Sequence, residues 1–238
     1  MNEYMFMMKL FIVLASALVA SGCTEHNSTE FNCTNLTQNY WETINNNKFG
    51  QQEDFLVLLD KLLQKEPACI NALALRGQAF FSMGKYDRAK SDFFNLTKLD
   101  SNNVYAYFEL GLISELERSF DSAVWFYEKA ISKKMQGDLI VDKNNESQKI
   151  FGRRGFDVKY VSIKLRKGIA NYYKGSINAS FIDLNYCIKQ DYSLDDAYLY
   201  RALIYSGLNK KRDACDDFKR AKDYGNMEVD ADIQKHCN

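Results

Sequence analysis

Small and apolar residues recur at spacings of three and four in two neighbouring stretches of the chain. They are Leu73, Gly77 and Phe80 in the first stretch and Ala89, Phe93 and Leu96 in the second. Because an α-helix completes a turn every 3.6 residues, each set lies on one face of a helix. The letters "SMGKYD" between them break the spacing, and Gly84 can take the left-handed backbone that ends a helix. The pattern predicts two antiparallel helices joined by a short turn.

This pattern recurs at a fixed interval of 34 residues. Gly77 corresponds to Gly111 and Phe93 to Tyr127, so size and character are kept while the residue changes. A second pair of copies follows, in which "KLRKGIANYYKGSINASFIDLNYCIKQ" corresponds to "YLYRALIYSGLNKKRDACDDFKRAKDYG". A fifth copy is degenerate, because Phe55 occupies the position where a small residue is expected, but its letters "DFLVLLDKLLQ" have the pattern of a second helix.

A helix–turn–helix unit of this length, with a small residue in each helix and aromatic residues three or four positions away, resembles the tetratricopeptide repeat. The resemblance implies an all-α fold, an α-solenoid in which each helical hairpin stacks on the next. It places repeats at about 36–69, 70–103, 104–137, 161–194 and 195–228, an insertion at about 138–160 and a capping helix at 226–237, all in one domain over 36–238. A helical bundle without a regular repeat is the alternative.

The insertion contains the letters "IFGRRGF", in which two arginines lie between glycines and aromatic residues. Arg153 and Arg154 are candidates to hold an acidic partner or a phosphate, with Phe151 and Phe156 as apolar anchors. The alternative is that the aromatic side chains pin the loop to the core while the arginines are solvated.

The first residues have the pattern of a secretory leader. Eleven apolar residues, "LFIVLASALVA", follow Lys9, a length that is too short for a membrane-spanning helix and suits the core of a signal peptide over 1–22. The letters "ASGC" resemble the bacterial lipobox, which implies lipid attachment at Cys23 and a polar tether over 23–35. Thr24, in place of an aspartate, implies the outer rather than the inner membrane of a bacterial cell envelope. The alternative is a secreted soluble protein whose cysteine at the cleavage site is incidental.

Five of the six cysteines lie after the lipobox, in a chain expected to reach an oxidising compartment. In the repeat model an antiparallel hairpin brings its open ends together, so Cys33 is a candidate to bond to Cys69. Cys215, near the start of the last repeat's second helix, is a candidate to bond to Cys237 at the end of the returning capping helix. Cys187 occupies a core position and is expected to be a buried free thiol. The alternative is that all five are reduced core residues.

Composition and charge exclude several classes of function. Lys and Arg together number 31, as do Asp and Glu, and no long basic run is present, so we expect no nucleic-acid partner. Only two histidines occur, and no spacing is typical of a metal site, a nucleophilic triad or a phosphate loop. We therefore expect no enzymatic activity, no metal and no cofactor. Carboxylates such as the pair Asp216–Asp217 are expected on solvated helix faces.

In tetratricopeptide proteins the first helices of the repeats line the concave side. Mapped onto this chain, that lining is mostly apolar and aromatic. It contains Tyr40, Phe81, Tyr105, Phe108, Leu112, Ile169, Tyr172 and Leu203, with Ile44, Gln78, Leu165 and Leu199 beside them. Such a groove favours an extended apolar segment or a helix of a partner protein. The alternative is that several of these residues pack between repeats, Leu165 or Leu199 among them.

The repeats and the leader together suggest a non-catalytic scaffold or adaptor in the bacterial cell envelope. Lipid at the N-terminus would hold it at a membrane while the groove binds a protein. Small tetratricopeptide lipoproteins of this kind resemble those that assist pilus, secretin or outer-membrane assembly. The alternative is a module that captures a glycan or a small nutrient on its aromatic groove.

Overall fold

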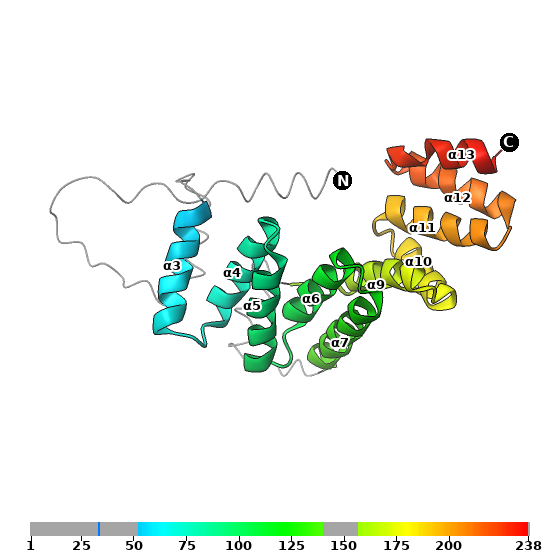
Figure 1. Ribbon diagram of the computed structural model, residues 1–238. Helices are drawn as coiled ribbons and strands as arrows, with labels where there is room; N and C mark the ends of the chain where they lie inside the picture. The colour runs from blue at the N-terminus through cyan, green and yellow to red at the C-terminus, as the bar shows by residue number, and fades with distance from the viewer. Residues whose placement is uncertain (1–32, 34–51, 140–156, 238) are drawn as a thin grey trace. The chain divides into compact units, whose positions relative to one another are not determined.

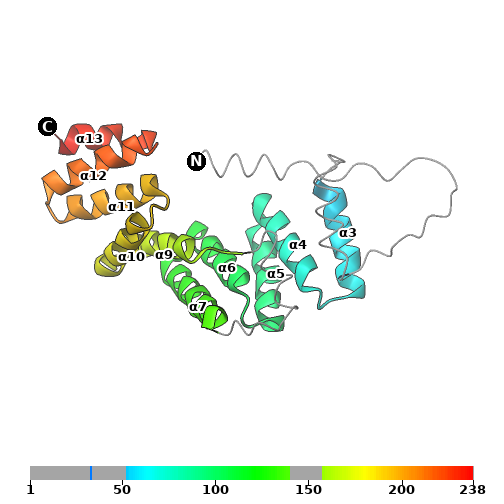
Figure 2. The same cartoon turned by 180° about the vertical axis from the view of Figure 1, so that it is seen from behind.

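The computed structural model describes residue 33 and residues 52–139 and 157–237 (Figures 1 and 2). In this part of the chain the regular secondary structure consists of ten α-helices and one 3-10 helix, without a strand. The predicted all-α fold is confirmed. Several residues named in the sequence analysis lie outside the described residues. They are Cys23 after the leader, Tyr40 and Ile44 in the first repeat, and Phe151, Arg153, Arg154 and Phe156 in the insertion.

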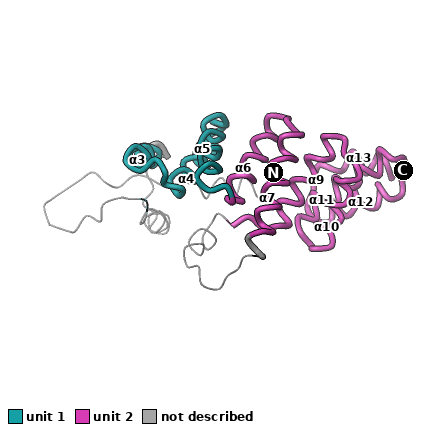
Figure 3. The backbone as a smooth tube through the Cα atoms, turned by 90° about the horizontal axis from the view of Figure 1, so that it is seen from below, with its two compact units in different colours: residues 1–101 teal, residues 102–238 magenta. Residues whose placement is uncertain are grey.

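The chain divides into two compact units, 1–101 and 102–238, and the boundary falls where two predicted repeats meet (Figure 3). Each unit is described by itself. Both are built from the same element, a pair of antiparallel helices joined by a short turn.

The described residues of the first unit form one such hairpin and a preceding helix. Its elements are α3 (Gln52–Lys65), α4 (Ile70–Ser82) and α5 (Tyr86–Leu99). The hairpin is formed by α4 and α5, and α3 packs against α4. Leu59 of α3 is fully buried, as are Phe93 and Leu96 of α5. The core therefore lies along the helix faces that the spacing of apolar residues identifies.

The second unit contains three further hairpins and a short C-terminal helix. Its elements are α6 (Val104–Leu116), α7 (Phe120–Leu139), α9 (Tyr160–Lys174), α10 (Ile177–Lys189), α11 (Leu194–Gly207), α12 (Lys211–Asp223), η1 (Met227–Val229) and α13 (Asp230–His236). Within this unit α9 packs against α7, and α11 packs against α10, so each hairpin lies next to the one before it (Figures 1 and 2). At the end α13 packs against α12, in the segment where the sequence predicts a capping helix.

The turn between the two helices has the same backbone conformation in all four hairpins. Gly84, Arg118, Gly175 and Asn209 occupy the same repeat position, and all have a positive φ between 57° and 85°. The sequence predicts this conformation at Gly84, where a missing side chain removes the steric cost. At Arg118 the same conformation costs about 1 kcal/mol. The position in the repeat therefore determines the turn, even where the residue disfavours it.

An aromatic ring of the second helix lies directly on a glycine of the first helix in two hairpins. A β-carbon added to Gly77 would lie 2.9 Å from the Phe93 ring, and one added to Gly111 would lie 2.4 Å from the Tyr127 ring. Both distances are shorter than real β-carbon contacts. The predicted close approach of the two helices is confirmed, and the ring itself fills the space that a side chain would need.

Three hairpins share an ion pair that the sequence analysis does not identify. In each, a cation of the first helix meets an aspartate of the second helix, 16 residues later. The pairs are Arg76–Asp92 (2.6 Å), Lys167–Asp183 (3.0 Å) and Arg201–Asp217 (2.6 Å), and the three aspartate side chains are at most 4% exposed. The hairpin over 104–137 has the apolar residues Leu110 and Phe126 at these two positions.

The expectation that Asp216 and Asp217 are both solvated is wrong for Asp217. Its carboxylate accepts hydrogen bonds from Nε and from a terminal nitrogen of Arg201, at 2.6 and 2.8 Å, whereas Asp216 is exposed. Arg201 also donates to Asn185 of the preceding hairpin at 2.6 Å. The pairing is necessary because a buried carboxylate without a cation costs several kcal/mol.

Two disulfides lie near the ends of the described chain. Cys33 is bonded to Cys69 with a Cα–Cα distance of 5.6 Å, and Cys215 is bonded to Cys237 with a Cα–Cα distance of 5.1 Å. These are the pairs that the repeat model predicts, and Cys187 is free and buried. The second disulfide holds the residue after α13 to the first half of α12.

We expect Gly111→Ala to destabilise the protein by about 2 kcal/mol, because the new β-carbon would displace the Tyr127 ring from the core. Gly207→Ala is the matched control, since a β-carbon on this helical glycine of α11 meets nothing within 4 Å. This change should leave stability unchanged or raise it by up to about 1 kcal/mol. Urea denaturation followed by circular dichroism measures both variants, and equal stabilities would contradict the close approach.

We expect Asp217→Ala to lower the free energy of unfolding by about 3 kcal/mol, because it leaves the largely buried Arg201 guanidinium without its carboxylate. The double variant Arg201→Leu/Asp217→Phe copies Leu110 and Phe126 of the hairpin over 104–137 and should recover most of the loss. Thermal and urea unfolding of the single and double variants test this. A double variant no more stable than Asp217→Ala would show that an apolar pair cannot replace the ion pair here.

Candidate partner-binding surface

The structure separates the predicted groove residues by burial. Phe81, Phe108, Tyr172 and Leu203 are half-buried and keep some surface for a partner. Among the neighbouring positions, Gln78 and Leu199 are also half-buried. The remaining described residues of the set, Tyr105, Leu112, Leu165 and Ile169, are buried.

The predicted groove lining is wrong at Tyr105, Leu112 and Ile169, because these side chains are buried. Ile169 packs in a core cluster with Leu184 of α10 and Ile204 of α11. In the preceding hairpin α6 packs against both α7 and α9, so its middle residues have neighbours on two sides. A position that faces outward in an isolated hairpin becomes a core position once the next hairpin stacks on it.

Four aromatic rings gather on the second unit, and we call them the tyrosine cluster: Phe120 of α7, Tyr172 and Tyr173 of α9, and Tyr200 of α11. Phe120 and Tyr173 stack with their ring centres 5.0 Å apart, and Tyr172 meets Tyr173 edge to face at 5.3 Å. Tyr200 meets Tyr172 and Tyr173 at 5.6 and 5.9 Å. Such contacts are typical of stable aromatic packing. Tyr173 is 48% exposed, so the cluster presents aromatic surface to solvent.

The hydroxyl groups of Tyr172 and Tyr200 remain protonated at neutral pH. Burial raises the pKa of Tyr172, and burial together with the neighbouring Tyr173 raises the pKa of Tyr200. The hydroxyl oxygens of Tyr173 and Tyr200 are 3.2 Å apart, within hydrogen-bond distance. The cluster can therefore offer aromatic edges and hydroxyl groups to a ligand.

Beside the cluster is a hollow of about 480 Å³, which we call the α9–α11 hollow. It is lined by Tyr172, Tyr173, Ile177, Leu203, Ile204, Gly207 and Leu208. Leu208, just after the end of α11, is 54% exposed. An apolar hollow with exposed apolar residues at its edge suits an apolar side chain of a ligand.

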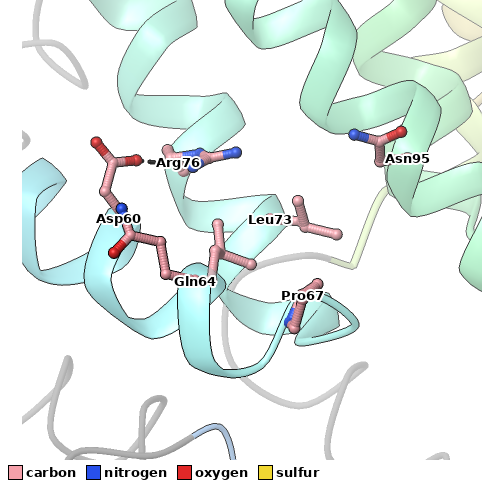
Figure 4. A pocket seen from close by; sticks show the side chains of 7 residues that line it. Asp60, Gln64, Pro67, Leu73, Arg76 and Asn95 are labelled. Atoms are coloured by element: carbon pink, nitrogen blue, oxygen red, sulfur yellow. Dashed lines mark hydrogen bonds and ion pairs between the residues drawn. The ribbon is translucent and has the colours of Figure 1, made fainter.

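A smaller hollow of about 290 Å³ lies in the first unit, among α3, α4 and α5 (Figure 4). Asp60, Gln64 and Asn95 give it a polar wall. Arg76 at its side donates to Asp60 at 2.7 Å and to Asp92 at 2.6 and 2.9 Å. The guanidinium is therefore held by two carboxylates of its own unit, and we favour the α9–α11 hollow as the binding site.

A network of polar side chains joins α6, α7 and α9. Glu115 accepts a hydrogen bond from the Tyr127 hydroxyl at 2.6 Å and another from Arg166. Burial raises the pKa of Glu115, against the opposing effect of Arg166. Glu109 is 6% exposed, and burial raises its pKa to about 8, opposed by a hydrogen bond from Tyr105. Glu109 is therefore mostly neutral at pH 7 in the folded protein.

Sequence reasoning found Tyr172 and Leu203 of this site but missed Tyr173, Tyr200 and Leu208. It considered only outward positions along the first helices, whereas Tyr173 and Leu208 lie where those helices end. The adjacent tyrosines in "ANYYKG" were the available signal. For the polar network, the signal was two glutamates inside the otherwise apolar letters "VYAYFELGLISEL".

Metal ligands, nucleophiles and membrane-spanning helices were sought among the described residues. No three His, Cys, Asp or Glu residues among them are arranged to hold a metal ion. Burial raises the pKa of the Cys187 thiol to about 12, so this cysteine is protonated and is a poor nucleophile. None of the described helices has the length and hydropathy needed to cross a bilayer.

Residues 70–103, which contain α4 and α5, match the family model of the tetratricopeptide repeat. The fold is that of a tetratricopeptide repeat protein. The crystal structure of MamA is similar, with a TM-score of 0.57 and 15% identity, over 82% of this chain and 95% of that chain. The crystal structure of PilW, described as a widely conserved type IV pilus biogenesis factor, has a TM-score of 0.57 and 13% identity, over 85% of this chain and 90% of that chain. At such identities the likeness shows the fold.

A curated relative is DnaJ homolog subfamily C member 7 of Homo sapiens, which is 24% identical over 80% of this chain and 44% of that protein. The chain thus spans less than half the length of this relative. Tetratricopeptide repeats typically form non-catalytic scaffolds that bind other proteins, because stacked hairpins create extended binding surfaces. This general class is what the repeat match and the fold support for the chain.

We expect Glu109 to make the protein less stable as pH rises. The folded protein binds the proton of the Glu109 carboxyl more tightly than the unfolded chain does. The resulting contribution to the free energy of unfolding is therefore complete below pH 4.5 and is lost as pH approaches about 8. The slope should reach at most about 1.4 kcal/mol per pH unit. In Glu109→Gln this slope should disappear, and above pH 8 the variant should be more stable than the wild type. Glu128→Gln, on the exposed side of α7, is the control. Parallel stability profiles of wild type and Glu109→Gln between pH 5 and 8 would contradict a neutral Glu109.

Proposed function

We propose that the protein is a non-catalytic scaffold that binds a partner protein on the surface formed by the tyrosine cluster and the α9–α11 hollow. The observation that carries this proposal is the exposed Tyr173 ring beside an apolar hollow whose edge exposes Leu208. Contiguous exposed apolar surface is costly in water and commonly marks a binding site. Tyrosine is also enriched where proteins bind each other, since its ring buries much area with little loss of side-chain entropy.

The hollow supports a ligand that inserts an apolar side chain. Ile177, Leu203 and Leu208 in its lining can contact such a side chain by van der Waals packing. The adjoining hydroxyl groups of Tyr173 and Tyr200 can hydrogen-bond to the backbone of the same segment. An extended segment or one turn of a partner helix provides both features.

Capture of a glycan fits the same surface less well. A sugar stacks on an open aromatic face and needs polar side chains around it. One face of Tyr173 is already stacked on Phe120, and the residues across the hollow are aliphatic. We therefore favour a protein partner over a saccharide.

We further propose that the chain works at a membrane of the bacterial cell envelope, held there by lipid on Cys23. The outer membrane is favoured by Thr24, and the partner would be another envelope protein. Replacing Cys23 tests the tether: Cys23→Ser should move the full chain from the membrane fraction to the soluble fraction of cells. A variant that still sediments with the outer membrane would argue against lipid attachment at this residue.

The binding surface is tested by crosslinking in cells. A photoreactive benzoylphenylalanine replaces Leu208 in the full chain, and a matched chain carries it at Ile182 of α10, which is 66% exposed and outside the lining of the hollow. We expect a discrete protein adduct from position 208 that is absent from position 182, and that Tyr173→Ala weakens. Identical adducts at both positions, or none at 208, would contradict the proposed surface.

A further inference from the structure

Three consecutive cationic residues follow Leu208, which lines the α9–α11 hollow. Lys210, Lys211 and Arg212 come two residues after Leu208, at the start of α12, and all three are exposed. In the described part of the chain neither Lys211 nor Arg212 forms an ion pair. Lys210 differs, because its ammonium lies 5.7 Å from the centre of the Tyr205 ring. Lys211 and Arg212, three and four residues after Leu208 of the hollow, are therefore the cations available to a ligand.

Helix energetics do not explain these cations. The first turn of an α-helix prefers acidic side chains, and a cation there costs about 0.3–1 kcal/mol. The first turn of α11 follows this preference with Asp195 and Asp196, whereas α12 has Asp213 alone after the three cations. A local arrangement that works against stability is often retained for function.

Another cation lies beside the tyrosine cluster. The Arg118 guanidinium is 5.8 Å from the centre of the Phe120 ring, which in turn stacks on Tyr173. Lys174 is also exposed at this edge, but its ammonium is paired with Asp121 at 2.8 Å. Two different turns thus contribute cations near this surface. Arg118 lies beside Phe120 of the cluster, and Lys211 and Arg212 follow Leu208 of the hollow by three and four residues.

We propose that the α9–α11 hollow binds a partner segment in which a large apolar side chain is flanked by acidic residues. The inference rests on the proposed function and adds the chemistry of the partner. The apolar side chain occupies the hollow against Tyr173 and Leu208. The flanking carboxylates meet Lys211 and Arg212 on one side and Arg118 on the other. Complementary charge of this kind determines which segment is accepted and speeds its association.

The test uses three fluorescent peptides with the full chain in detergent. Each has a central phenylalanine, flanked on both sides by four glutamates, four serines or four lysines, and binding is followed by fluorescence anisotropy. We expect the glutamate peptide to bind about tenfold more tightly than the serine peptide at low salt, and the difference to shrink as salt screens the charges. The lysine peptide should bind most weakly.

Charge reversal separates recognition from folding. Lys211→Glu/Arg212→Glu should lose the preference for the glutamate peptide while still binding the serine peptide. Because acids suit the first turn of a helix, the same variant should be at least as stable to heat as the wild type. Lys189→Glu/Lys219→Glu makes the same change of charge at exposed sites outside the hollow and should keep the preference.

The outcomes distinguish this inference from the proposed function. The acidic character of the partner is contradicted if the wild type binds the glutamate and serine peptides equally, or if the preference survives in Lys211→Glu/Arg212→Glu. Neither result contradicts the proposed apolar binding surface. Failure of all three peptides to bind overturns both. A third outcome is that the wild type binds phosphatidylglycerol vesicles, that Lys211→Glu/Arg212→Glu abolishes this binding, and that the wild type does not discriminate among the peptides. This result would assign the cations to a lipid surface and overturn the inference.

Discussion

In two hairpins an aromatic ring of the second helix rests on a glycine of the first, and the arrangement of each hairpin depends on this contact. Phe93 lies on Gly77 and Tyr127 lies on Gly111, at distances that leave no room for a β-carbon. The contact brings the helices close enough to bury their apolar faces together. Since a single hairpin leaves a further face uncovered, the next hairpin must stack on it, and burial of Ile169 among three helices is the result.

Close helix packing also explains the buried ion pairs. Once the helices are close, the residue beside the glycine position and the residue 16 positions later face each other in a dry environment. Three hairpins place Arg or Lys opposite Asp there, and the fourth places Leu110 opposite Phe126. Either a paired charge or an apolar pair satisfies the site, whereas a single charge would not. Arg201 shows a further use of the pair, because it also reaches Asn185 of the preceding hairpin.

The surface suited to a partner lies where the first helices end. Stacking of the hairpins buries the middle residues of α6 and α9 in the core, but Tyr173 and Leu208 at the helix ends remain exposed. The left-handed turn that follows each first helix then directs the chain into the second helix, and in the last hairpin that helix starts with Lys211 and Arg212. Leu208, which lines the hollow, is thus separated from these two cations by only two residues of the turn.

The sequence by itself determined the helices and their pairing, because spacing of three and four residues, the recurrence after 34 residues and the position of Gly84 depend only on local geometry. It identified Cys33–Cys69 and Cys215–Cys237 as candidate pairs, and the tertiary structure decided that both are bonded. The sequence could not determine which outward residues stay exposed. Tyr105, Leu112 and Ile169 have the pattern of groove residues, and their burial depends on how the elements pack in three dimensions. The same holds for Asp217 and Glu109, whose environments are set by side chains distant in sequence. Only the tertiary structure decided these, since burial is a property of neighbours and not of the residue.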